Sequence, residues 1–238
     1  MLFYYIRHGD PIYDPDSLTP LGKRQAEAVG RRLAVHGIDE IYASTSKRAI
    51  QTAEPLSEIL KKKITLLDFA NEGHAWQELT AITPEGRRWM FHHSESRKLF
   101  TSPEVIALGH EWYNHPAFAS FDYEAGMNRI LKEANAFFAS LGYEHDGRLG
   151  RYKITKKNDK RIALFAHQGF GLAFLSTVLD IPYPLFSTRF DITHSGVTVI
   201  EFGDEGDGYS IPRVLTLSSE AHIYKENLPT RFSNGIYY

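Results

Sequence analysis

The chain has 238 residues, of which 42% are hydrophobic and 24% charged, a globular composition that excludes disordered, collagen-like and membrane-spanning classes. Its net charge is −2, so no general basic field favours nucleic acid as a partner. The absence of cysteine excludes disulfides and thiolate metal sites, and neither a basic leader nor an apolar run of about 18 residues is expected. These features predict a cytoplasmic protein that binds neither membrane nor nucleic acid.

The first part of the chain alternates strand and helix patterns. Residues 2–6 (LFYYI) are a continuous apolar run, as in a strand that is covered on both faces. Thr19 and Pro20 form a typical helix start, and Gly37 supplies a stop. Residues 40–44 (EIYAS) then predict a second strand.

A second helix is expected to open at residues 44–46, with Pro55 as an interruption or kink, and residues 64–68 (ITLLD) predict a third strand. Residues 70–122 break this rhythm, because they are rich in Trp, His, Gly and Pro. We interpret them as a cap-like insertion across one end of the domain.

The remainder of the chain predicts another amphipathic helix, a buried strand with its own helix, and two closing strands. These lie at residues 130–141, 162–166, 169–179, 196–202 and 213–217. The alternation predicts one α/β domain over residues 1–238, a three-layer α/β/α sandwich with a mostly parallel central sheet. The closing strands do not alternate with helices, so at least one strand is expected to be antiparallel.

Charged and titratable side chains follow three of the predicted strands. Arg7 and His8 end the first strand, Arg48 lies in the first turn of the helix after the second, and His167 follows residues 162–166. Ligands of open α/β sheets collect beyond the carboxyl ends of the strands, so we expect these four side chains to converge. Helix N-termini add backbone N–H donors there. The sequence therefore predicts a pocket for a dianion, of which a phosphoryl group is the best fit.

The segments "IRHGD", "LTPLGKRQA", "YASTSKRAIQTAEPL" and "LFAHQG" resemble, in the same order, the successive motifs of the histidine phosphatase superfamily, also called phosphoglycerate mutase-like. The resemblance covers roughly residues 2–60 and 161–179. It implies a phosphoric monoester hydrolase that works through a phosphohistidine, without a metal or an organic cofactor.

The resemblance implies a role for each of the four converging residues. His8 would be the nucleophile, and Arg7, Arg48 and His167 would hold the phosphoryl oxygens. Nearby guanidinium groups disfavour protonation of His8, and their fork of donors suits a tetrahedral anion. Gly9 would let the backbone approach closely.

Hydrolysis also needs an acid for the leaving alkoxide, and the family places a glutamate on the loop after the third strand. Glu72 lies close to that spacing, with Asp68 and Glu78 as alternatives. We favour Glu72, because Asp68 is expected to belong to the strand end. The role would require a raised carboxyl pKa.

Two features depart from the family pattern. Pro11 and Asp14 stand where Thr and Asn are often found, and the carboxylate of Asp14 would repel phosphate if it pointed inward. We therefore expect Asp14 to point away or to be paired. Gln168 follows the second histidine in place of a glycine, but its backbone N–H is kept.

The resulting hypothesis is a phosphatase that acts on a small-molecule phosphomonoester. One alternative is a bisphosphate-dependent phosphoglycerate mutase, although the insertion does not resemble the basic, proline-rich segment expected of those enzymes. The other is a non-catalytic phosphate-binding module. No metal is expected, because the histidines of the insertion show no HExxH spacing. The sequence does not specify the natural substrate, and a homodimer is left open.

Overall fold

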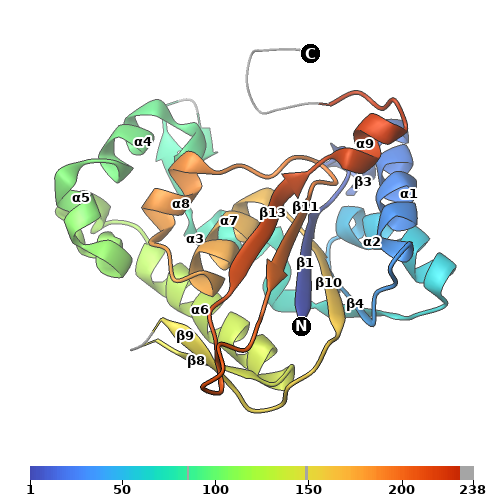
Figure 1. The fold of residues 1–238 in the computed structure, drawn as a ribbon. Helices are drawn as coiled ribbons and strands as arrows, with labels where there is room; N and C mark the ends of the chain where they lie inside the picture. Colours follow the sequence, from blue (N-terminus) through green and yellow to red (C-terminus); the bar gives the residue numbers. More distant parts are fainter. Residues whose placement is uncertain (85, 148–149, 231–238) are drawn as a thin grey trace.

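Six strands form the central sheet of the computed structural model, which describes residues 1–84, 86–147 and 150–230. Their order is β13–β11–β1–β10–β4–β5 (Figure 1). The bounds are β1 Leu2–Arg7, β4 Glu40–Ser44, β5 Ile64–Leu67, β10 Arg161–Ala166, β11 Val197–Glu201 and β13 Arg213–Ser219. Strands β1, β10, β4 and β5 are parallel, whereas β11 is antiparallel to both of its neighbours. The mostly parallel sheet with an antiparallel strand is therefore confirmed.

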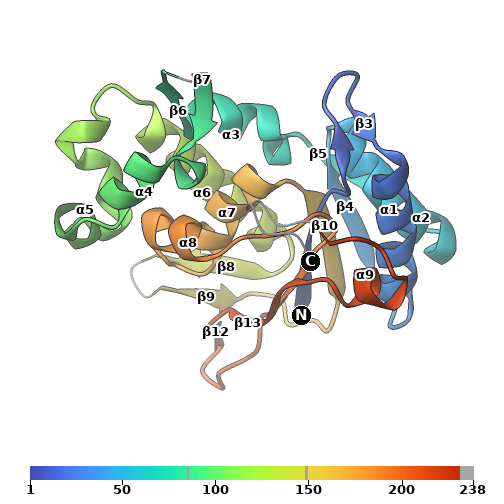
Figure 2. The same ribbon diagram turned by 90° about the horizontal axis from the view of Figure 1, so that it is seen from above.

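Helices cover both faces of the sheet (Figures 1 and 2). On one face lie α1 (Pro20–Ala34) and α2 (Lys47–Leu60), and on the other α6 (Tyr123–Ser140) and α7 (Gln168–Val178). Successive side chains of β1 point to opposite faces of the sheet and pack against the two helix layers. Ile6 packs with Val29 of α1, whereas Phe3 packs against Phe138 of α6 and Phe174 of α7. The predicted three-layer α/β/α sandwich is confirmed. None of the helices formed by the described residues is long and apolar enough to cross a membrane.

The start of α1 is formed by Thr19 and Pro20, as predicted. Thr19 caps the helix by accepting a hydrogen bond from Gly22 N, and Pro20 takes the first helical position. Pro55, in contrast, lies inside α2 and does not end it. A Cβ built on Gly30 of α1 would lie 3.0 Å from the Cβ of Pro55, so this glycine allows the two helices to cross closely.

The segment between β5 and α6 contains several short elements. They are η1 (Asp68–Ala70), α3 (Glu72–Glu78), β6 (Thr80–Thr83), β7 (Gly86–Trp89), η2 (Met90–His92), α4 (Ser94–Phe100), α5 (Pro103–Ala107), η3 (Gly109–Asn114) and η4 (Pro116–Phe118). Buried rings hold part of the segment together: Trp112 lies 5.2 Å from Phe100 and 5.6 Å from Tyr183 of α8 (Tyr183–Arg189), measured between ring centroids. This aromatic core ties the segment to the main domain.

A two-stranded sheet, a three-stranded sheet and one short helix complete the fold. They are β2 (Pro11–Ile12) with β3 (Ser17–Leu18), β8 (Tyr143–Asp146) with β9 (Arg151–Ile154) and β12 (Tyr209–Ser210), and α9 (Ala221–Lys225). In α9, His222 is buried: its Nδ1 accepts from Arg32, and its Nε2 lies 2.9 Å from the hydroxyl of Ser195. Burial, with a smaller effect of Arg32, lowers the pKa of His222 to about 3.

We expect this histidine to make stability depend on pH. Between pH 6.5 and about 3 the unfolded chain binds a proton at His222 that the folded chain excludes, so stability falls as the pH falls. Between pH 7.5 and 5.5 this histidine should lower the free energy of unfolding by about 1.4 kcal/mol. The free energy of unfolding, measured with urea at both pH values, should therefore fall less in His222→Gln than in the wild type, by about this amount. The exposed His36, changed to Gln, should keep the wild-type drop.

Candidate active site

The nucleophile candidate lies on the short turn that follows β1. His8 is buried, and its backbone N–H donates to Ala166 O of the neighbouring strand β10. Its Nδ1 lies 2.7 Å from the carbonyl oxygen of Gly9. Because a carbonyl only accepts, Nδ1 carries the hydrogen, and Nε2 keeps its lone pair.

The surroundings of His8 keep its imidazole neutral. Burial is the largest effect, followed by His167 and then by the positive charges of Arg7 and Arg48; together they lower the pKa of His8 well below 6.5. A neutral ring with a free Nε2 near pH 7 is the form that a nucleophilic histidine needs.

His167 reaches the same place from the end of β10. Its ring centroid lies 5.2 Å from that of His8. Arg48 donates to its Nδ1 over 3.1 Å, so Nε2 carries the hydrogen, 2.8 Å from the hydroxyl of Ser44. The hydroxyl of the buried Tyr5 donates to the backbone carbonyl of His167 over 2.6 Å. The two predicted histidines are thus brought together.

Both predicted arginines lie beside these two histidines. Arg7 donates to Ile192 O and to His194 Nε2, and Arg48 donates to Asp16 as well as to His167. Within the described residues the Nε–H of each guanidinium is buried and has no hydrogen-bond partner. Each arginine therefore retains a donor that a bound oxyanion could use.

Glu72 is the first residue of α3, and its carboxylate lies against the start of α7. Its two carboxylate oxygens accept hydrogen bonds from the N–H groups of Gly169 and Phe170, both over 3.0 Å. Burial raises the pKa of Glu72, against the opposing effects of these bonds and of Arg48 and Arg7. The charges of Arg7 and Arg48 act on both Glu72 and His8, so these groups share one electrostatic environment.

The two alternative acids have other roles. Glu78 forms an ion pair with Arg129, with oxygen–nitrogen distances of 2.6 and 2.7 Å. Asp68 is exposed and pairs with His74. It begins η1 rather than ending β5, so the expectation that it belongs to the strand is wrong. Of the three carboxylates, Glu72 is the one that the structure places next to the histidine-bearing strand end.

The predicted motifs also contain residues that hold the nucleophile's turn. Gln25 accepts from Asp10 N over 2.8 Å, and Thr52 accepts from Gly9 N over 3.0 Å. A Cβ built on Gly9 would lie 2.6 Å from the carbonyl oxygen of Gly22. The close approach expected at Gly9 is therefore an approach to the backbone of α1, which fixes the turn against that helix.

Two polar residues of the site were missed by sequence reasoning. The ring of His194 lies 5.6 Å from that of His8, between centroids, and it contacts Arg7. Asp16, 2.8 Å from the Arg48 guanidinium, also accepts from Lys47 N. Asp14 is exposed, in line with the expectation that it points away. Asp16, in contrast, does reach the site through Arg48.

An aromatic side chain from the segment between β5 and α6 packs against the start of α7. A Cβ built on Gly169 would lie 2.3 Å from two ring atoms of Trp89, and Trp89 also contacts Trp76 and Phe91. Gly169 is therefore required where the indole passes over the helix end that binds Glu72.

The substitution Gly169→Ala should lower the free energy of unfolding by about 1–3 kcal/mol, because the added methyl group overlaps the indole of Trp89. The double variant Gly169→Ala/Trp89→Phe should recover part of this loss, since phenylalanine lacks the overlapping ring atoms. Urea unfolding of both single variants and the double variant measures the coupling. Purely additive losses would contradict the contact.

Known proteins share sequence features and the fold of this chain. Residues 3–111 match the family model of the histidine phosphatase superfamily (branch 1). A search of curated proteins found no match. Among solved structures, phosphoserine phosphatase from Entamoeba histolytica in complex with 3-phosphoglyceric acid is 17% identical, with a TM-score of 0.58, over 93% of this chain and 98% of that one. A mycobacterial glucosyl-3-phosphoglycerate phosphatase in complex with VO3 is 16% identical, with a TM-score of 0.58, over 92% and 99%.

At these identities the two structures show a shared fold. Together with the family match, they confirm the resemblance to the histidine phosphatase superfamily that the motifs predict.

Proposed function

We propose, from the match of residues 3–111 to the histidine phosphatase superfamily, that the protein is a phosphatase that hydrolyses phosphomonoesters through a phosphohistidine on His8. Phosphatases among the structural neighbours support the hydrolase class. The observation that carries the proposal is the hydrogen bond from His8 Nδ1 to Gly9 O, which leaves Nε2 unprotonated in a cluster of two arginines and a second histidine.

In the first step His8 Nε2 attacks phosphorus, and the bond between phosphorus and the leaving oxygen breaks. Arg7, Arg48 and His167 stabilise the charge that develops on the phosphoryl oxygens. The hydrogen bond from Nδ1 to Gly9 O holds the ring while Nε2 becomes bonded to phosphorus.

The leaving alkoxide takes a proton from Glu72, whose raised pKa favours the protonated form that can donate. In the second step water attacks the phosphohistidine and gives its proton back to Glu72. Phosphate leaves, and His8 returns to its neutral form. The same carboxyl group thus serves as acid and then as base.

This chemistry requires neither a metal nor an organic cofactor, and its partner is a small-molecule phosphomonoester. A cytoplasmic location stays a prediction.

The test is release of phosphate from 4-nitrophenyl phosphate by the full chain in the presence of EDTA. We expect turnover that chelation does not reduce. Activity that appears only on phosphoglycerates primed with a bisphosphate would identify a mutase instead. Binding of inorganic phosphate without turnover of any phosphomonoester would identify a phosphate-binding module and would contradict the proposal.

A further inference from the structure

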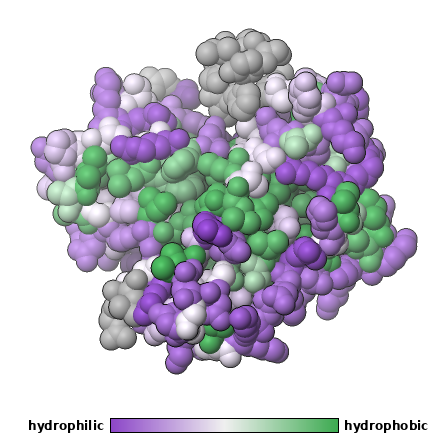
Figure 3. Space-filling model, in the orientation of Figure 1, coloured by the Kyte–Doolittle hydropathy of each residue, from purple (hydrophilic) through white to green (hydrophobic). Residues whose placement is uncertain are grey.

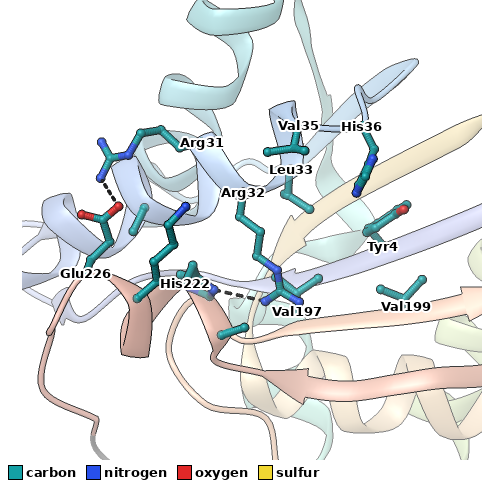
Figure 4. Close-up of a pocket in the computed structure, with 13 residues that line it drawn as sticks. Tyr4, Arg31, Arg32, Leu33, Val35, His36, Val197, Val199, His222 and Glu226 are labelled. Atoms are coloured by element: carbon teal, nitrogen blue, oxygen red, sulfur yellow. Dashed lines mark hydrogen bonds and ion pairs between the residues drawn. The ribbon is translucent and has the colours of Figure 1, made fainter.

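A pocket of about 510 Å³ lies on the face of the sheet that α1 partly covers (Figure 4). Tyr4 of β1 and Val197 and Val199 of β11 line it on the sheet side, and Leu33 and Val35 line it on the α1 side. None of the proposed catalytic or phosphate-binding residues is among its lining residues, which excludes Arg7, His8, Arg48, Glu72 and His167. The pocket is therefore separate from the candidate active site.

The layering of the fold explains why this pocket exists. Strands β11 and β13 extend the sheet beyond α1, and among the described helices the short α9 lies near them on this side (Figure 1). In the orientation of Figure 1, hydrophobic surface is gathered in the middle of the molecule and is bordered by hydrophilic residues (Figure 3). Val35, at the rim, is 74% exposed.

The polar centre of the pocket is Arg32. Its guanidinium donates to Nδ1 of His222 (Figure 4). It also donates to the carbonyl and hydroxyl oxygens of Ser219. All three acceptors are neutral, and no carboxylate of the described residues lies within 4.0 Å of Arg32. The guanidinium is half-buried, and burial lowers its pKa. A cation that is withdrawn from water without a counter-ion is unfavourable, so the site favours an anion.

The other charged residues that line the pocket are mostly positive. They are Arg31 and Lys225, against a single lining carboxylate, that of Glu226, which lies 3.2 Å from Arg31. The lining therefore combines an apolar floor with an excess of positive charge. An apolar molecule without a charge would leave Arg32 uncompensated, and a small inorganic anion would leave the floor exposed to water.

We infer that this pocket binds a small organic anion, a carboxylate with an apolar body. The carboxylate pairs with Arg32, and the body lies on Tyr4, Val197 and Val199. The volume lies within the range of about 300–1,000 Å³ that is typical of small-molecule sites.

The test is isothermal titration of the full chain with 4-phenylbutyrate, compared with its neutral analogue 4-phenylbutanamide. We expect saturable binding of the carboxylate and binding of the amide that is at least about tenfold weaker, because a charge-assisted pair is lost. Arg32→Gln should weaken binding of the carboxylate by at least about tenfold. Val35→Asp, at an exposed position, should also weaken it by repulsion and needs no change in the core.

Arg24→Gln is the matched control, since it removes the same charge from an exposed position of α1 outside the pocket and should leave binding unchanged. Saturating inorganic phosphate should not displace the probe. The inference is overturned by absence of saturable binding, by equal affinity in Arg32→Gln, or by displacement with phosphate, which would place the probe in the candidate active site. None of these outcomes depends on turnover, so the test is independent of the proposed phosphatase activity.

Discussion

Replacement of His8 by alanine should lower kcat/KM for 4-nitrophenyl phosphate by roughly 10⁴-fold or more, because the proposed covalent step loses its only nucleophile. The side chain is buried and makes its ring hydrogen bond to Gly9, within its own turn, so the fold should survive the change. Steady-state kinetics with the two proteins at matched concentration measures the loss.

Two further measurements make this result specific. The exposed His110, changed to Ala, should keep wild-type activity. Rapid acid-free quenching of the wild type with labelled substrate should trap a phosphoprotein that is stable to base and labile to acid, as a phosphoramidate is, and His8→Ala should not form it. Substantial turnover by His8→Ala, or a phosphoprotein on another residue, would rule out the assignment.

The change Glu72→Gln should lower kcat/KM for an alkyl phosphate by about 10²–10⁴-fold, the usual range for a general acid. The loss in kcat/KM on 4-nitrophenyl phosphate should be much smaller, because that leaving group needs little protonation and kcat/KM does not include the later hydrolysis of the phosphohistidine. The wild-type rate on the alkyl substrate should fall as the pH rises above the raised pKa of Glu72, and the variant should lack this decline.

Asp68→Asn is the matched control for Glu72→Gln, because Asp68 is exposed and its side chain contacts His74 and Thr45 rather than the start of α7. It should retain the wild-type activity on both substrates. Equal losses in kcat/KM on alkyl and aryl phosphates in Glu72→Gln would contradict the acid role, as would a loss in Asp68→Asn that matches it.

Much of the sheet could be predicted because its inner strands are unbroken apolar runs. Strand β4 occupies residues 40–44 as predicted, and the predicted strands 2–6 and 162–166 each differ from β1 and β10 by one residue. These strands are covered on both faces, so their composition alone identifies them. The site residues at their ends could be expected to converge because parallel strands end at one edge.

The two missed residues could not be predicted, because their place in the site depends on tertiary contacts that the local sequence does not show. His194 meets Arg7 across 187 positions of sequence, at the entry to an antiparallel strand for which no strand-end rule predicts a polar site. Asp16 lies in a hairpin whose strands have two residues each, so no periodicity sets the direction of its side chain. Pro55 does not interrupt its helix, because packing against α1 outweighs the local cost of proline.

The central position of β1 has a practical consequence. Because β10 and β11 flank it, His8 is surrounded by groups from segments that meet only in the native chain, namely those around residues 48, 167 and 194. A phosphate analogue that bridges them should bind the native state alone and stabilise it by mass action by about 2.7 kcal/mol at a hundredfold excess over Kd, which raises the melting temperature. Thermal shifts can therefore rank candidate substrates before any product assay exists.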